Sequence, residues 1–212
     1  MFKIHNRIAQ DEDFIGFKNM TLEYFNKEWN NIHGYLEIII EDYKIGYYHE
    51  DLLLDDKICG DWVNGWLELL ANAVYYLPKT KYVAFQEPEV WRWLEFTFIG
   101  ENEIIFKHPM DKGWLETTCY EGESLPEIEE PNDEEAIEAT YIGSKEIFIT
   151  EKNVELFIVE PLTEYRFNYE NMKSEVIGAI DKFFCELVEI NPTLMETQMA
   201  KDLLEKIDRI HQ

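Results

Sequence analysis

The sequence has few cysteines, and they are not arranged as in a secreted protein. Its 212 residues include three, Cys59, Cys119 and Cys185, which are too few and too widely spaced for a fully paired disulfide framework. The first residues lack the apolar stretch of a signal peptide, because the polar Asn6 and Arg7 are soon followed by three acidic residues. No apolar run reaches the ~20 residues that a bilayer span needs. We therefore expect a cytoplasmic protein without a transmembrane segment.

Basic residues are also scarce. Lys and Arg number 19 against 44 Asp and Glu, which gives a formal net charge of −25 at pH 7. Such an excess of carboxylates repels the phosphates of nucleic acids and anionic lipids, so neither nucleic acid nor a membrane is an expected partner. A basic protein would be attracted and would associate faster at low salt. The alternative interpretation is that the charge only keeps the chain soluble.

The common enzyme motifs are missing. There is no G-x-x-x-x-G-K-[ST] loop, no G-x-G-x-x-G, no G-x-S-x-G, no H-E-x-x-H and no EF-hand spacing. The histidines are scattered singly, so we expect no cofactor and no metal site; they are His5, His33, His49, His108 and His211. The cluster His49-Glu50-Asp51 could supply a general base, but adjacent residues at a strand end point to different sides. A solvated hairpin end is the favoured interpretation.

A carboxylate-based enzyme is a second hypothesis, because glycoside hydrolysis needs only two acids across a sugar-binding cleft. With 44 acidic residues a suitable pair is always available, so this signal is unspecific. A homo-oligomeric scaffold, with exposed aromatic side chains buried between copies, is a third hypothesis. Since the enzyme motifs are absent, we expect a binding protein and not an enzyme.

What the chain does have is ample apolar material, with 46% hydrophobic and 15% aromatic residues. In residues 35–41, Leu36, Ile38 and Ile40 alternate with period 2, which predicts a strand, and residues 45–48 suit the second arm of a hairpin. Residues 22–32, behind the possible N-cap Thr21, are compatible with either a helix or a strand.

A helix is predicted over about residues 61–76, with Asp61 as its N-cap and Pro78 after its last apolar position. Trp62 and Trp66 begin its apolar stripe, so both are expected in the core. Strands at 82–85, 90–98 and 103–107 then form a predicted antiparallel meander, which continues in strands at 146–150, 154–159 and 165–169.

Two helices are predicted at the C-terminus. The first follows Asn171 as candidate N-cap, and the second begins near Pro192, with either Asn191 or Thr193 as its cap. A short connection should leave them antiparallel. The predicted fold class is therefore α+β: an antiparallel meander sheet, a helix after the first hairpin and a C-terminal antiparallel helix pair.

An acidic stretch interrupts the sheet. No Lys or Arg occurs between Gly113 and Ser144, which predicts a single domain over residues 1–212 with an acidic loop insertion at about 121–140. Three interpretations are ranked: a solvated loop, a contact surface for a basic partner, and a weak Ca²⁺ site. Calcium ranks last because the segment from Glu127 to Glu138 is interrupted by Pro and has no Gly for a tight turn.

Three segments are distinctive: the hairpin start G-Y-L-E-I-I-I at residues 34–40, the helix D-W-V-N-G-W-L-E-L-L at 61–70 and the amphipathic C-terminal helix. Together they resemble the immunity proteins that neutralise bacterial polymorphic toxins. The resemblance is one of general sequence character over most of the chain, without a diagnostic motif, and it points to no particular immunity family. It implies a protein that occludes the active site of a toxin, often a basic nuclease, and has no catalytic residues of its own.

This resemblance and the charge lead to one hypothesis about partner-binding residues. Acidic side chains would steer and pair with Lys and Arg of a basic toxin domain, while aromatic side chains would be apolar anchors. Trp91 and Trp93 could instead belong to the core. The proposed acids are Glu127, Glu129, Glu130, Asp133, Glu134 and Glu135, and the proposed anchors are Trp91, Trp93 and Tyr169.

Overall fold

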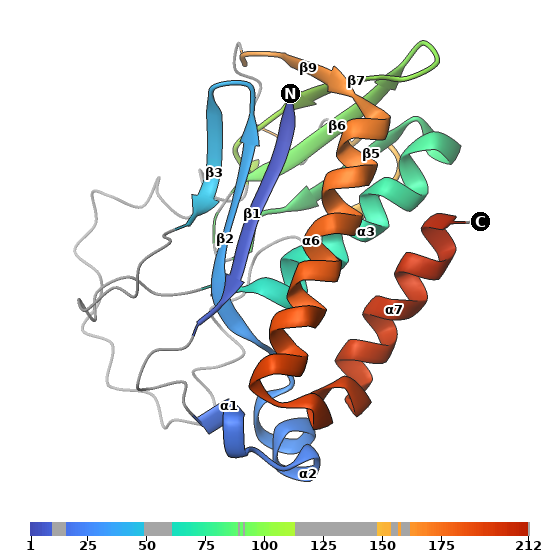
Figure 1. The fold of residues 1–212 in the computed structure, drawn as a ribbon. Helices are drawn as coiled ribbons and strands as arrows, with labels where there is room; N and C mark the ends of the chain where they lie inside the picture. The colour runs from blue at the N-terminus through green and yellow to red at the C-terminus, as the bar shows by residue number, and fades with distance from the viewer. Residues whose placement is uncertain are drawn as a thin grey trace, which may run out of the picture.

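The structure is a computed structural model, which describes residues 1–9, 16–48, 61–88, 90, 92–112, 148–153, 157 and 162–211. Helices and two antiparallel sheets make up this part of the chain, so the predicted α+β class is confirmed (Figure 1). The hairpin, the helix after it and the C-terminal helix pair are all present. The strands, however, form two sheets where the sequence pattern predicted one.

Sheet A contains the predicted hairpin and two strands that the sequence pattern did not predict. Its order is β1 (Phe2–Ile8), β2 (His33–Ile40) and β3 (Tyr43–Tyr47), and β4 (Asp61–Trp62) pairs with the start of β2. Period-2 alternation places Ile4, Ile38 and Ile45 side by side across the three strands, all buried. One face of sheet A therefore belongs to the core.

Sheet B contains the predicted meander. Its five strands are ordered β8 (Phe148–Ile149), β5 (Tyr82–Gln86), β6 (Trp93–Ile99), β7 (Glu103–Lys107) and β9 (Tyr165–Asn168). The expected strand over residues 154–159 lies largely outside the described residues, as does the acidic insertion.

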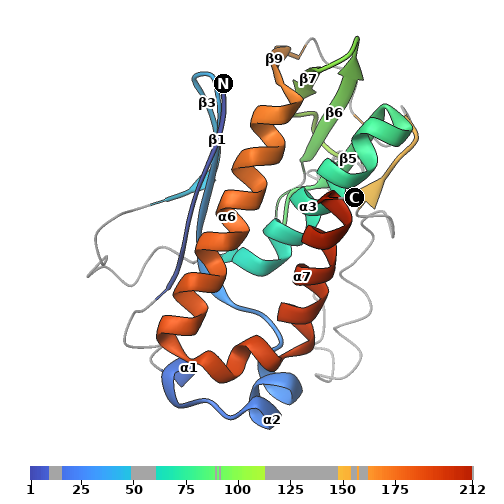
Figure 2. The same ribbon diagram turned by 45° about the vertical axis from the view of Figure 1, so that its right-hand side comes forward.

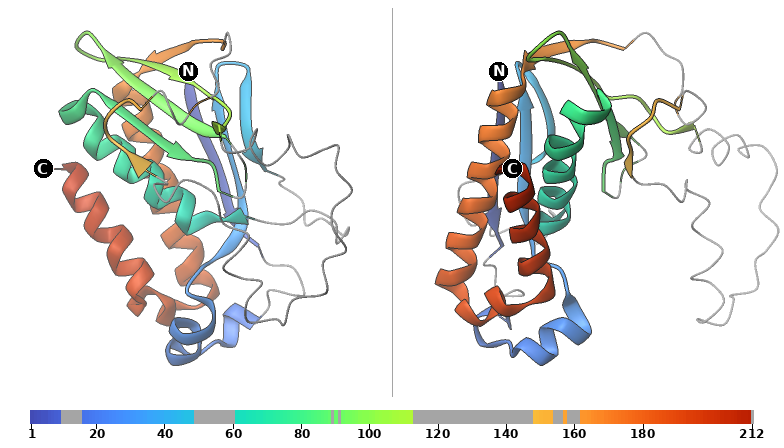
Figure 3. Two further views of the ribbon diagram at one scale, coloured as in Figure 1. Left: turned by 180° about the vertical axis from the view of Figure 1, so that it is seen from behind. Right: turned by 90° about the vertical axis from the view of Figure 1, so that its right-hand side faces the viewer.

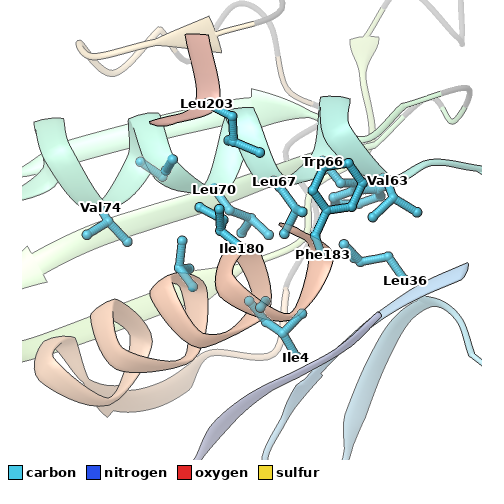
Figure 4. Packing of buried hydrophobic residues seen from close by; sticks show 14 of the residues in the cluster. Ile4, Leu36, Val63, Trp66, Leu67, Leu70, Val74, Ile180, Phe183 and Leu203 are labelled. Carbon is cyan, nitrogen blue, oxygen red and sulfur yellow. The ribbon is translucent and has the colours of Figure 1, made fainter. Parts of the chain in front are cut away.

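Helix α3 (Val63–Thr80) is the centre of the molecule. It lies between sheet B on one side and α6 (Tyr169–Ile190) and α7 (Gln198–His211) on the other (Figure 3). Trp66, Leu70 and Val74 on its inner stripe meet side chains from α6, α7 and sheet A (Figure 4). One cluster of buried hydrophobic side chains therefore extends from β1 to α7.

Helices α6 and α7 run in opposite directions, as predicted (Figure 2). A 3₁₀ turn, Pro192–Glu196, connects them, and Asn191 caps that turn by accepting from the Thr193 amide. The second helix was expected from about Pro192, but α7 begins only at Gln198, where Thr197 Oγ1 accepts from the Ala200 amide. Helix α7 packs mainly on α3. No helix within the described ranges is both long and apolar enough to span a membrane.

Three local predictions need correction. Helix α3 begins at Val63, so Trp62 sits in extended backbone before the first turn and is 41% exposed, whereas Trp66 on the stripe is 1% exposed. Pro78 lies inside the last turn of α3 and does not follow the helix. Helix α6 is capped by Asn168, whose side chain accepts from the Asn171 amide.

The segment with an ambiguous pattern is helical. Helix α1 (Gly16–Asn19) is followed by α2 (Leu22–Tyr24), for which Thr21 is the N-cap, as expected. A π-helical turn, Phe25–Trp29, continues α2 and ends at Asn30 in the left-handed region, with φ of 55°.

The free edge of β1 is closed by side chains of α6. The amides of Phe2, Ile4 and Ile8 donate to side chains spaced along that helix: Asn171 Oδ1 at 2.8 Å, Glu175 Oε2 at 3.2 Å and Glu186 Oε2 at 2.7 Å. Between them, Lys182 Nζ donates to the Asn6 carbonyl, and Asn6 Nδ2 donates to the Ala179 carbonyl. An edge strand covered in this way does not offer its backbone to another chain.

Candidate functional site

The acidic stretch is attached to sheet B at both ends. Before it, Met110 forms a bridge with Arg92 and Asp111 forms one with Phe157. After it, β8 pairs with β5. Residues 113–147, which include all six proposed partner-binding acids, lie outside the described residues, and so does Trp91.

The attachment lies on the face of sheet B that turns away from α3. Alternation along β5 and β6 sends Val83, Phe85, Leu94 and Phe96 to the main core and their neighbours to this second face. A small apolar cluster covers that face; its members are Tyr82, Ala84, Trp93, Ile149 and Phe157.

Trp93 is a structural residue of this second cluster. Its side chain has no exposed surface, its ring lies edge-on to Phe157 with centroids 5.6 Å apart, and its Nε1 donates to Asp111 Oδ2 at 2.7 Å. The hypothesis that Trp93 is a surface anchor therefore does not fit the structure. The bond to Asp111 instead fastens the chain just before the acidic stretch.

Two further carboxylates are buried near this face. Glu95 is 5% exposed, and Lys152 Nζ lies 3.2 Å from its Oε1. Burial, together with the neighbouring Glu95 carboxylate, raises the pKa of Tyr82. Glu87 is also buried, and its Oε2 lies 2.9 Å from His108 Nε2.

His108 connects the two sheets. Its other ring nitrogen, Nδ1, is 2.8 Å from the hydroxyl of Tyr43 on β3, and Tyr43 stacks on Tyr165 of β9 with centroids 5.1 Å apart. Burial raises the pKa of Tyr43, against the opposing charge of Arg92. The chain Glu87–His108–Tyr43 has the order of a catalytic relay, but a phenol with a raised pKa stays protonated near neutral pH and is a poor nucleophile.

The buried acids of the described part are thus engaged in internal contacts. Each of the four has a basic or hydrogen-bonding partner: Glu37 with Lys44, Glu87 with His108, Glu95 with Lys152, and Asp111 with Trp93. Such pairs hold elements together, and removing one partner would leave a buried charge. Their arrangement is better suited to stabilising the fold than to acid–base catalysis.

Tyr169 is the first residue of α6, away from this face. Its hydroxyl replaces a backbone hydrogen bond that is missing in α3. Pro78 has no N–H, so it cannot donate to the carbonyl of Val74 four residues earlier. The Tyr169 hydroxyl donates to that carbonyl at 2.9 Å, and burial raises the pKa of Tyr169 to about 12. Its ring packs on Phe98, on the core face of β6. The structure therefore does not bring Tyr169 and Trp93 together.

Net charge is unevenly distributed along the chain. The described residues contain 23 Asp and Glu against 17 Lys and Arg, a net charge of −6, and the remaining residues contain 21 against 2, a net charge of −19. The cluster His49-Glu50-Asp51 belongs to the remainder. Among the residues with described positions, no three His, Cys, Asp or Glu side chains are grouped so as to hold a metal ion.

Sequence reasoning missed the contacts of Glu87, His108 and Tyr43. These residues are 21 and 65 positions apart and come from both sheets, so no local spacing indicates that they meet. Comparisons with models of protein families, with curated proteins and with solved structures gave no match. Function must therefore be inferred from the contacts and charges of this chain.

Proposed function

We propose that this protein is a non-catalytic binding protein that neutralises a basic partner, as an immunity protein neutralises its toxin. The observation that carries the proposal is the division of charge. A nearly balanced, internally paired scaffold is joined to a stretch, residues 113–147, that has 11 acidic residues and one lysine.

The electrostatic argument is direct. Buried acids of the scaffold are already paired, so they add little to the attraction of a partner. The acids of residues 113–147 greatly outnumber the basic residues of that stretch, and their field raises the rate of encounter with a cationic surface. The described residues on both sides of the stretch pair with sheet B or bridge to it, so the stretch begins and ends at this sheet.

A basic nuclease is the partner class that best fits this chemistry. Its active site binds phosphates through Lys and Arg, and a series of carboxylates presents the same sign of charge. Occlusion of such a site needs no catalytic group on the inhibitor. The six acids already named, from Glu127 to Glu135, are the proposed contacts.

The test compares three proteins of defined charge. In the six-acid variant, these side chains become Gln or Asn. In the control variant, six exposed acids of the described part, none in an observed ion pair, are changed likewise: Glu23, Glu101, Glu151, Asp181, Glu189 and Glu196. Each variant has a net charge of −19 instead of −25.

The tagged proteins are incubated with host lysate at low ionic strength and eluted with a salt gradient into a mass spectrometer. We expect the wild type and the control variant to retain the same basic protein, and the six-acid variant to release it at lower salt or not to bind it. Equal retention by all three proteins would exclude the acidic stretch. A stable homodimer without a partner, or turnover of a sugar panel, would favour the scaffold or the hydrolase hypothesis.

A further inference from the structure

An exposed tryptophan lies where β4 pairs with the start of β2, next to the end of β1. Trp62 was expected in the core, yet it is 41% exposed, a large fraction for a tryptophan of a folded domain. Its ring stands perpendicular to that of His33, which in turn stands perpendicular to Trp29, with centroids 6.3 Å apart in both pairs. We call Trp29, His33 and Trp62 the aromatic column.

The aromatic column is held rigidly. Trp62 Nε1 donates to His33 Nε2 at 3.2 Å, which links the two rings directly. The backbone beneath is fastened as well, because the Val63 amide donates to the Ile32 carbonyl and the Ile32 amide donates to Asn64 Oδ1 at 2.8 Å. An exposed ring with so little freedom loses little entropy when a partner covers it.

Irregular backbone is concentrated beside the column. Trp29 ends the π-helical turn, and Asn30 directly after it has a positive φ of 55°. Single π-helical turns and left-handed non-glycine residues are found disproportionately at functional sites. Here they come shortly before β2, whose first residue, His33, contacts both tryptophan rings.

We propose that the aromatic column is a second contact surface, at which Trp62 receives an arginine or lysine side chain of the basic partner. This proposal rests on the proposed function. Tryptophan is the side chain that binds cations most strongly through its ring face, and Trp and Arg are common anchors of protein interfaces.

The net charge of the protein favours a cationic side chain over a nucleic-acid base as the ligand of Trp62. A chain with a net charge of −25 attracts a cationic side chain and repels a nucleic acid, whose bases could otherwise stack on an indole.

The test uses tetra-arginine, N-acetylated and C-amidated, as the probe. Binding is followed through the indole N–H signal of Trp62 in two-dimensional NMR, assigned by its loss in Trp62→Phe. We expect this signal to shift and saturate, and Trp62→Ala to weaken binding about fivefold or more, as expected for one cation–π contact. Trp62→Ala leaves the net charge unchanged, so a weaker affinity would be due to the ring.

Control variants distinguish binding at the aromatic column from non-specific electrostatic attraction between tetra-arginine and the acidic protein. Tyr24→Ala removes another exposed aromatic ring, which lies on α2 outside the column, and should leave affinity unchanged. Trp62→Phe keeps an aromatic face and should retain part of the affinity, which also guards against misfolding of Trp62→Ala. The inference is overturned if tetra-arginine leaves the Trp62 signal in place, or if cellohexaose shifts it instead.

The six-acid variant makes failure of the two proposals distinguishable. If it binds tetra-arginine weakly but still shifts the Trp62 signal, both surfaces contribute. If it weakens binding and Trp62→Ala does not, the acidic stretch is supported and the aromatic column is refuted. The reverse result would support the column and refute the role of the acidic stretch.

Discussion

At the scale of single residues, Asn191 is a buried polar side chain whose hydrogen bonds connect distant parts of the chain. It is buried, its Nδ2 donates to the carbonyls of Phe17 and Met20 at 2.9 Å each, and its Oδ1 accepts from Thr193. It thus ties the connection between α6 and the 3₁₀ turn Pro192–Glu196 to the segment around α1. The residue type alone predicted a cap but not the two long-range bonds.

We expect Asn191→Ala to lower the free energy of unfolding by about 2–3 kcal/mol, because it removes a cap and leaves two carbonyls without their partner. Urea denaturation measures this change. Asn19→Ala is the matched control: Asn19 is exposed, and its replacement should change stability by less than about 0.5 kcal/mol. Equal effects of the two substitutions would contradict the assigned role.

Tyr169 and Pro78 form a second residue-scale prediction. Tyr169→Phe removes the bond to the Val74 carbonyl and should cost about 1 kcal/mol. Pro78→Ala restores a backbone donor to that carbonyl, so the cost of Tyr169→Phe should shrink in the Pro78→Ala protein. A double-mutant cycle measures this coupling, and strictly additive effects would contradict it.

The same tyrosine makes stability depend on pH. Its pKa is raised from 10.0 when unfolded to about 12 when folded. The unfolded chain therefore releases this proton first, and the stabilisation is complete below pH 10 and is lost as pH rises from 10 to about 12. In Tyr169→Phe, the fall of stability over this interval should be shallower than in the wild type, and an unchanged profile would argue against the raised pKa.

At the scale of elements, the closure of β1 by α6 shows how two distant segments depend on each other. Glu186→Ala removes the acceptor of the Ile8 amide, so we expect a loss of about 1–2 kcal/mol and faster hydrogen exchange at Ile8. Glu186→Gln keeps an acceptor oxygen and should cost less. Glu189→Ala, an exposed acid on the same helix, is the control, and equal exchange at Ile8 in both alanine variants would contradict this closure.

The elements differ in how much the sequence could predict of them. Period-2 and helical stripes located β2, β7 and α3, because one face of each is apolar and buried. Strand β1 was missed because Asn6 occupies a core position, where only its bond to the Ala179 carbonyl makes burial tolerable. Both Asn168 and Asn171 could cap α6, and only backbone geometry decides between them.

The candidate site was less predictable than the fold. Composition located the acidic stretch, but it could not separate Trp62, which is exposed, from Trp66, which is buried, because both fit one helical stripe. The two differ because α3 begins at Val63, which leaves Trp62 in extended backbone before the helix and Trp66 on its buried stripe. The contacts of Trp93 with Asp111 and of Glu87 with His108 depend on sheet pairing, which no local pattern contains.

At the scale of the whole molecule, net charge is unevenly distributed along the chain. The described part has a net charge of −6, while the rest has −19. Self-repulsion of closely spaced acids disfavours a compact state. Neutralising the six acids should therefore leave the free energy of unfolding unchanged or raise it slightly, while weakening attraction to a basic partner. This combination separates a binding role from a structural one.

The association rate constant between the protein and its captured basic partner, measured by stopped flow against ionic strength, tests the proposed function most directly. We expect a steep decrease with salt for the wild type and the control variant, and a slower, flatter response for the six-acid variant, although both variants have the same net charge. Identical salt dependences for the six-acid and control variants would contradict specific steering by the acidic stretch.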